Sequence, residues 1–83
     1  MEISSSPWVG TLQNDLRVYR LRKGLTQRQA SILLGINRNR LSLWEGGKGL
    51  PSFQEIEKIA NAYGVAISQL YPEKVLSLLI ASP

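Results

Sequence analysis

The segment from Gln27 to Gly46 constrains the fold of this chain most, because it predicts two short helices joined at one glycine. Gly35 suits the turn, since glycine readily adopts the left-handed backbone that ends many helices. A turn glycine alone is weak evidence, because helical hairpins are common. Small and apolar residues flank it at helical spacing: Ala30, Ser31, Leu34, Ile36, Leu41 and Trp44. Seven compatible positions therefore predict two helices that cross closely at a fixed angle.

The second of these helices begins with a polar cluster formed by Arg38, Asn39 and Arg40. Long hydrogen-bond donors at the exposed start of such a helix suit the base edges of the DNA major groove. The alternative is a solvated helix end without a ligand. Within this two-helix pattern, contact with DNA is the favoured interpretation.

Helical spacing and capping residues predict an all-α chain without strands. Thr26 with Gln29, and Ser52 with Glu55, are expected to form capping boxes, and Asn37 is expected to cap the helix after it. The five expected helices span about 12–23, 27–34, 38–45, 53–63 and 68–71, the last one capped by Ser68. The fourth helix is expected to turn one apolar side inward, formed by Phe53, Ile56, Ile59, Ala60 and Tyr63.

Three regions follow from this reading of the chain. Residues 1–10 are expected to be a flexible arm in which Trp8 docks on the domain. Residues 11–72 contain the five helices. Residues 73–83 form a short C-terminal segment that is too apolar for a free tail.

The composition excludes several classes of site. The 83 residues allow one domain, and they contain neither cysteine nor histidine, which removes disulfides, thiolate metal ligands and the commonest general base. No nucleotide-binding glycine pattern occurs, since GGKG lacks the required spacing. The sequence thus predicts no enzyme, cofactor, metal or small-molecule ligand. The sequence has no long apolar run and no secretory signal at its N-terminus. We therefore expect no membrane contact and a cytoplasmic location.

Positive charge is concentrated in one half of the chain. Residues 11–50 carry eight cations and two carboxylates, a net +6, whereas residues 51–83 have a net charge of −1. Such asymmetry fits a polyanionic partner, but a solvated basic surface explains the charge equally well.

Four short motifs resemble the lambda-repressor-like (Cro/cI, or xenobiotic-response-element) helix-turn-helix family. They are Gly24-Leu25-Thr26-Gln27, Leu34-Gly35-Ile36, Trp44-Glu45-Gly46-Gly47-Lys48 and Leu50-Pro51-Ser52, and the similarity extends over about residues 12–71. The resemblance implies a compact five-helix DNA-binding domain. It also implies a homodimer on a palindromic operator and a role in transcriptional regulation.

The resemblance also implies roles for individual residues. The base-contacting positions are Arg38, Asn39, Ser42 and Leu43, and the phosphate-binding positions are Thr26, Gln27, Arg40, Gly46 and Lys48. The amides of the glycine loop are expected to remain open to phosphate. Arg20 and Glu45 match a family ion pair between the first and third helices. Trp44 is expected in the core.

Several apolar residues depart from the family pattern. Val18 and Leu21 in the first helix, and Ile32 and Leu33 in the second, occupy positions that are normally polar. These additional apolar side chains are expected to be buried by another segment or another molecule. The C-terminal segment can bury them, either within the chain or across a dimer, through Val75, Leu76 and Leu79.

The favoured function is a sequence-specific duplex DNA-binding regulator, such as a small phage or mobile-element repressor. An antitoxin or a restriction-modification controller of the same fold is an alternative. A protein-interaction module that has lost DNA binding is another, although such a module does not need the basic start of the third helix.

Overall fold

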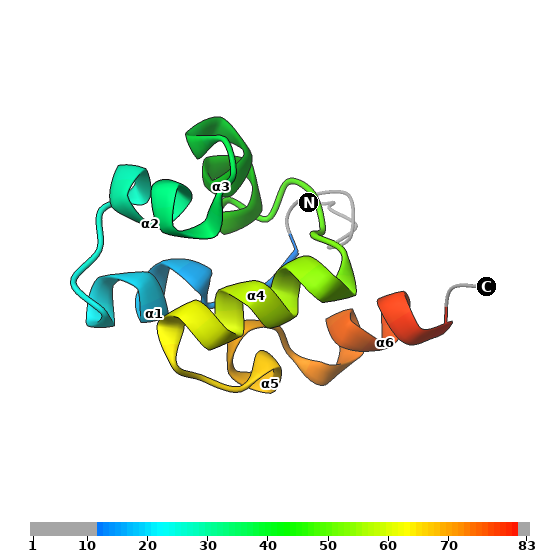
Figure 1. Cartoon of the computed structure of the whole chain (residues 1–83). Coiled ribbons are helices and arrows are strands. Elements are labelled where there is room, and N and C mark those ends of the chain that lie inside the picture. The colour runs from blue at the N-terminus through cyan, green and yellow to red at the C-terminus, as the bar shows by residue number, and fades with distance from the viewer. Residues whose placement is uncertain (1–11, 82–83) are drawn as a thin grey trace, which may run out of the picture.

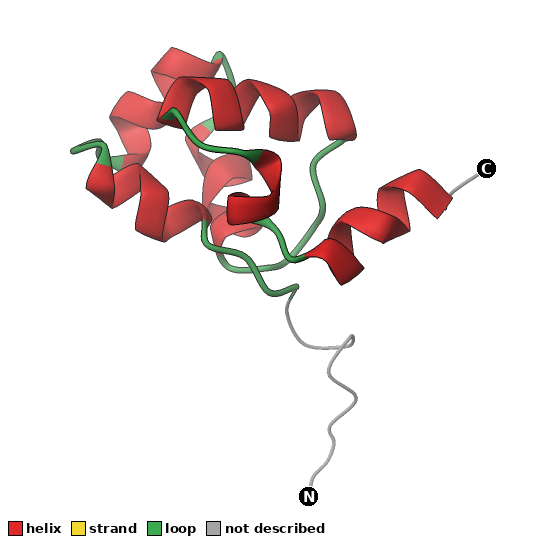
Figure 2. Ribbon diagram, turned by 90° about the horizontal axis from the view of Figure 1, so that it is seen from below, coloured by secondary structure: helices red, strands yellow, loops and turns green. Residues whose placement is uncertain are grey.

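The computed structural model describes residues 12–81, and these residues form helices without strands. The helices are α1 (Leu16–Arg22), α2 (Gln27–Leu34), α3 (Arg38–Glu45), α4 (Phe53–Tyr63), α5 (Ile67–Leu70) and α6 (Glu73–Ala81). The α2–α3 pair lies on one side of α1 and α4, and α5 lies on the other side (Figures 1 and 2). α6 extends away from the other helices near the N-terminal end of α4. The predicted all-α fold is confirmed, with α6 as an additional helix. No helix in this part of the chain has the length and apolarity to cross a membrane.

The three central helices have the predicted bounds, because their capping residues act as expected. Thr26 and Ser52 each accept a hydrogen bond from the amide three residues on, while Gln29 and Glu55 accept from the amides of Thr26 and Ser52. Asn37 caps α3 by accepting from the Asn39 amide. These side chains satisfy amides that a helix start leaves without partners.

The α2–α3 turn depends on the positive φ of Gly35, which is 68°. This conformation lets the Ile36 amide reach the Ser31 carbonyl at 3.0 Å and close the end of α2. A residue with a Cβ atom would be strained there. The turn thereby determines the orientation of α3 relative to α2.

Two predicted helix starts are wrong. α1 begins at Leu16 and not near Leu12, because the amides of Leu12 and Asp15 donate to the carbonyls of Gly47 and Leu70. Asn14 also accepts from the Leu16 amide and holds this segment outside the helix. α5 begins after Ala66, whose amide donates to the Gln69 side chain, so Ser68 lies inside the helix and does not cap it.

The core lies where the six helices meet, and most of the predicted inward residues are buried. It contains Leu16, Ala30, Leu34, Leu41, Trp44, Ile56, Ile59, Ala60, Tyr63, Leu70, Tyr71, Val75 and Leu76. Phe53 is an exception, since it is 37% exposed at the start of α4 and not in the core as expected. The expected docking of Trp8 and the expected arm, residues 1–10, lie outside the described residues.

Val75 and Leu76 belong to this core, and Leu79 packs against it. They do not cover the surplus apolar residues of α2, since Ile32 is 72% and Leu33 is 56% exposed, and α6 lies at the opposite end of the molecule (Figure 1). The expectation that the C-terminal segment covers α2 within the chain is therefore wrong. Ile32 and Leu33 remain candidates for a contact with another molecule.

Candidate nucleic-acid interface

α3 has two different faces. Leu41 and Trp44 are 0% and 5% exposed, and they anchor the helix in the core. Arg38, Asn39, Ser42 and Leu43 are exposed on the remaining surface. The structure thus brings the four predicted base-contacting residues together on the surface of one helix.

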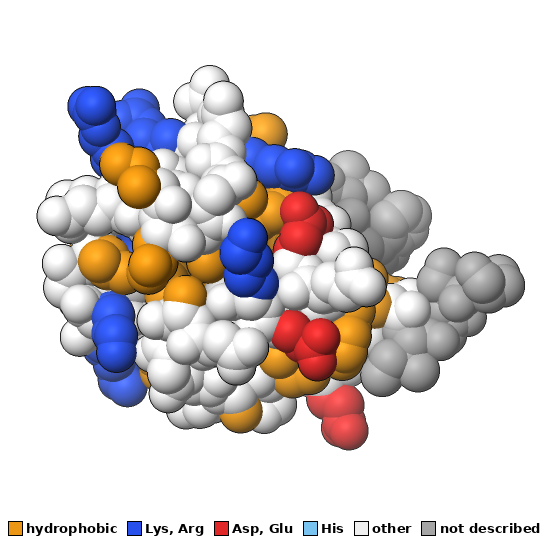
Figure 3. Space-filling view, viewed as in Figure 1, with side chains coloured by type: hydrophobic (Ala, Val, Ile, Leu, Met, Phe, Trp, Pro, Cys, Tyr) orange, Lys and Arg blue, Asp and Glu red, His pale blue; other side chains and the backbone are white. Residues whose placement is uncertain are grey.

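Exposed basic side chains are present on α1, α2, α3 and the loop after α3. Arg17, Arg22, Lys23, Arg28, Arg38, Arg40 and Lys48 are all exposed, whereas Asp15 is the one exposed carboxylate between residues 12 and 50. Figure 3 shows Lys and Arg side chains at the top, over α2–α3, and further ones at the lower left and in the centre, whereas Asp and Glu side chains lie right of centre, toward the start of α4 and α6. The charge asymmetry of the sequence is therefore also an asymmetry of the folded surface.

A buried ion pair joins α1 to the end of α3. Arg20 Nε lies 2.6 Å from Glu45 Oε2, and the two side chains are 7% and 5% exposed. Arg20 Nη2 donates to Glu45 Oε1, and Nη1 donates to the Leu25 carbonyl in the loop before α2. The pair that the family resemblance implies is therefore present, and one guanidinium ties three segments together.

The same carboxylate also binds the start of α2. Gln27 Nε2 donates to Glu45 Oε1 over 3.0 Å. The sequence predicted Gln27 as a phosphate contact but did not predict this hydrogen bond. The two residues are 18 positions apart, and only the crossing of α2 and α3 brings them together.

Tyr63 lies near this ion pair, and its hydroxyl has no hydrogen-bond partner among the described residues. Burial raises its pKa from 10.0 to about 12, and the nearby Glu45 carboxylate contributes to the rise. The fold therefore favours the neutral phenol.

We expect this shift to lower the stability of the fold at high pH. The stabilisation is complete below pH 10, where the phenol is neutral in both states, and it is lost as the pH rises toward about 12, because the unfolded chain ionises first. Urea unfolding at pH 9 and pH 11 measures the loss. Tyr63→Phe should lose less stability than the natural chain over that interval, and an equal loss would contradict the assignment.

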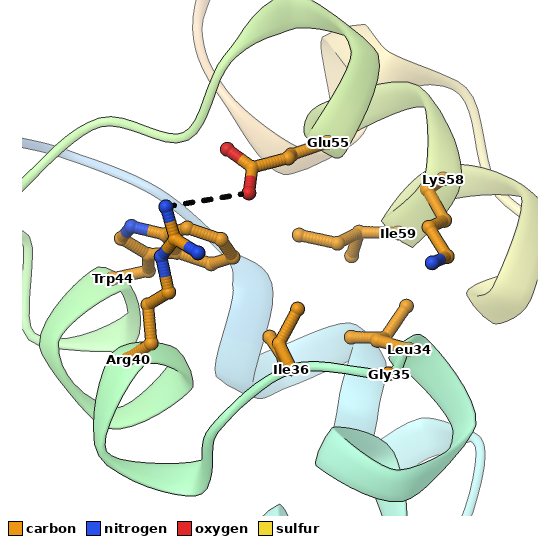
Figure 4. A pocket seen from close by; sticks show the side chains of 8 residues that line it. All are labelled: Leu34, Gly35, Ile36, Arg40, Trp44, Glu55, Lys58 and Ile59. Carbon is orange, nitrogen blue, oxygen red and sulfur yellow. Dashed lines mark ion pairs between the residues drawn. The ribbon is translucent and has the colours of Figure 1, made fainter.

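Arg40 points toward α4 in the structure. Its guanidinium lies 5.3 Å from the centre of the Trp44 ring, and Nη2 is 3.6 Å from Glu55 Oε2. Arg40, Trp44 and Glu55 line a hollow of about 230 Å³ between the α2–α3 turn and α4 (Figure 4). Lys58 lies on the other side of that hollow. The Arg40 side chain is 58% exposed and contacts Glu55 through Nη2 alone, so its other N–H groups can still bind a phosphate as predicted.

Three amides of the glycine loop are not open, which corrects the expectation from sequence for these groups. The amides of Gly46, Gly47 and Lys48 donate to the carbonyls of Ser42, Trp44 and Leu43. They complete the end of α3 and cannot also bind a phosphate. Gly46 and the Lys48 side chain are exposed beside this loop.

No group of three His, Cys, Asp or Glu residues in the described chain lies close enough to hold a metal ion. The exposed surface of α3 carries hydrogen-bond donors, one apolar side chain and positive charge.

A family model described as a helix-turn-helix domain matches residues 14–70, which include α1 to α5. The chain belongs to this helix-turn-helix family. The predicted resemblance is confirmed, and the matched region contains every residue that the sequence assigned to DNA contact.

Two solved structures are similar in sequence and fold. The hypothetical transcription factor NHTF from Neisseria is 33% identical with a TM-score of 0.62, over 77% of this chain and 76% of that one. The restriction-modification controller protein C.AhdI from Aeromonas hydrophila is 32% identical with a TM-score of 0.62, over 68% of this chain and 85% of the controller.

A curated relative is the HTH-type transcriptional activator BcrR of Enterococcus faecalis. It is 36% identical over 55 residues, which are 66% of this chain. This helix-turn-helix chain spans only 27% of the activator's length. The similarity to the activator therefore concerns the helix-turn-helix region.

Proposed function

We propose that this chain is a sequence-specific double-stranded DNA-binding regulator of transcription that inserts α3 into the major groove. The exposed surface of α3 carries the proposal, since Arg38, Asn39, Ser42 and Leu43 face solvent while Leu41 and Trp44 hold the helix to the core. Arginine can donate two hydrogen bonds to guanine, and asparagine pairs with adenine. Leu43, which is 52% exposed, suits contact with a thymine methyl group.

Phosphate contacts are proposed on both sides of α3. Thr26 and Gln27 lie at the start of α2, and the exposed Lys48 side chain follows the end of α3. Together these positions would fix the helix in the groove without contributing sequence information. Gly46 is withdrawn as a phosphate contact, because its amide donates to the Ser42 carbonyl. We also propose Arg40 as a phosphate contact, since its side chain is 58% exposed and only Nη2 approaches Glu55.

Selection of random duplex DNA on the purified chain tests this function. We expect an enriched palindromic site whose half-sites are about one DNA turn, roughly 34 Å, apart. If no site is enriched, sequence-specific DNA binding is contradicted and the alternative of a protein-interaction module is supported. A single, non-palindromic half-site would contradict the dimer.

A restriction-modification controller is the second candidate. The similarity to the C.AhdI controller, over 85% of that chain, favours it over the remaining alternative of an antitoxin. The enriched site distinguishes these roles. A controller should have its site next to genes for a nuclease and a methyltransferase, whereas an antitoxin should have it beside a toxin gene.

Lys48→Ala is expected to weaken binding to all sequences alike, because a phosphate contact carries no sequence information. The slope of log affinity against log salt should fall by about 1 for each lysine removed. Fluorescence anisotropy from 50 to 200 mM salt measures it. Lys74→Ala, on α6, should leave the slope unchanged, and a binding curve that does not depend on salt would contradict the electrostatic contribution.

The proposed homodimer can use α6, where Leu78 is 55% exposed beside the partly buried Leu79. Leu78→Lys is expected to shift the chain toward monomer, since it places a charge in an apolar contact. Sedimentation equilibrium measures the shift. Asn61→Lys, at an exposed polar position on α4, is the control for the added charge and should not change the association. Association that survives Leu78→Lys unchanged would exclude α6 from the interface.

A further inference from the structure

The start of α2 and the end of α3 share one carboxylate. Glu45 Oε2 accepts from Arg20 Nε, and Glu45 Oε1 accepts from both Arg20 Nη2 and Gln27 Nε2, at 3.2 and 3.0 Å. Arg20 is fixed in turn by its bond to the Leu25 carbonyl. Glu45 is thus held in place by Arg20 and presents a second acceptor to Gln27.

This hydrogen bond determines which end of the Gln27 amide is available to a ligand. A glutamine amide has two N–H donors on one side and a carbonyl acceptor on the other, and the two ends have nearly the same shape. Only the N–H end suits a phosphate, because phosphate oxygens are acceptors. Glu45 engages one N–H of Nε2 and leaves the second for another acceptor.

We infer that Glu45 is a positioning residue for DNA binding, which orients the Gln27 amide with its free N–H toward a backbone phosphate. The inference rests on the proposed phosphate contact of Gln27. Without Glu45 the amide can rotate and present its carbonyl oxygen, which repels phosphate. Binding would then have to order a side chain that is already ordered in the natural chain, at a cost that corresponds to about 3- to 10-fold in affinity.

The same contact connects the two proposed DNA-contacting elements. Gln27 is the first residue of α2 and Glu45 the last residue of α3. The Glu45 carboxylate and the Arg20 guanidinium that holds it are almost completely buried, whereas Gln27 is partly exposed and can meet a ligand. The phosphate-binding residue of α2 and the base-contacting residues of α3 would therefore keep a fixed position relative to each other.

A double-mutant cycle tests the inference. Gln27→Ala, Glu45→Gln and the double variant are compared by anisotropy on the selected duplex and on a random duplex. We expect Glu45→Gln to weaken binding to both duplexes about 3- to 10-fold when Gln27 is present, and by less than 2-fold when Gln27 is already replaced. The preference for the selected site should not change.

An equal effect of Glu45→Gln in both backgrounds would overturn the inference, because Glu45 would then act through the angle of α3. A Gln27→Ala variant that binds as well as the natural chain would also overturn it. Glu45→Asp replaces Glu45→Gln if the latter does not fold. It keeps the charge that faces Arg20 but withdraws the carboxylate from Gln27 by one methylene group.

A second measurement needs neither a variant nor DNA. In the NMR spectrum of the free chain, the side-chain amide protons of Gln27 should exchange with water more slowly than those of Gln54, an exposed glutamine on α4. Equal exchange would overturn the inference. If slow exchange is found but no duplex is bound, the proposed function fails while the orientation of Gln27 stands.

Discussion

Glu45→Ala is expected to lower the free energy of unfolding by about 3–5 kcal/mol. The substitution leaves the Arg20 guanidinium, whose side chain is 7% exposed, without its carboxylate partner. Removing one member of a buried ion pair leaves an uncompensated charge in a medium that solvates it poorly. The large expected effect therefore measures the cost of an unpaired charge and not the net value of the pair.

Urea unfolding followed by circular dichroism measures this loss, with Arg38→Ala as the control. Arg38 is exposed at the start of α3, so its replacement should change the free energy of unfolding by no more than about 0.5 kcal/mol. An equal loss in both variants would contradict the assignment of Glu45 to structure and Arg38 to binding.

Arg38→Ala is expected instead to remove specific DNA binding. Loss of a bidentate contact to one base costs about 1–3 kcal/mol for each half-site, which is roughly 5- to 150-fold in affinity, and a dimer incurs this cost twice. The base preference at one position of each half-site should relax, because other bases no longer leave a donor unpaired.

Selection of random duplexes with this variant measures the change directly. Lys48→Ala provides the contrast, since it should weaken binding without altering the selected sequence. If Arg38→Ala selected the same site with the same preference at every position, Arg38 would not contact a base.

The central helices show how much of the fold the sequence predicts. α2, α3 and α4 begin and end at the predicted residues, because each has a capping side chain before it and a glycine after it. These signals are local, acting within about four residues. The burial of Leu41 and Trp44 follows from the same local pattern.

The sequence-based predictions are wrong where residues far apart in the chain form hydrogen bonds with each other. α1 starts late because its preceding amides bond to the carbonyls of Gly47 and Leu70, which lie far along the chain. The amides of Gly46, Gly47 and Lys48 are occupied because the glycine loop turns back on α3. Spacing within one segment carries no information about such contacts.

The sequence by itself determined the bounds of α2, α3 and α4 and which face of α3 is inward, since both follow from the 3.6-residue period and from capping groups. Only the tertiary structure decided that Glu45 is shared by Arg20 and Gln27, and that Ile32 and Leu33 stay uncovered while Val75 and Leu76 enter the core. The physical reason is that hydrogen bonds and burial depend on distances in space. Those distances are set by how the helices cross and not by the order of residues within any one helix.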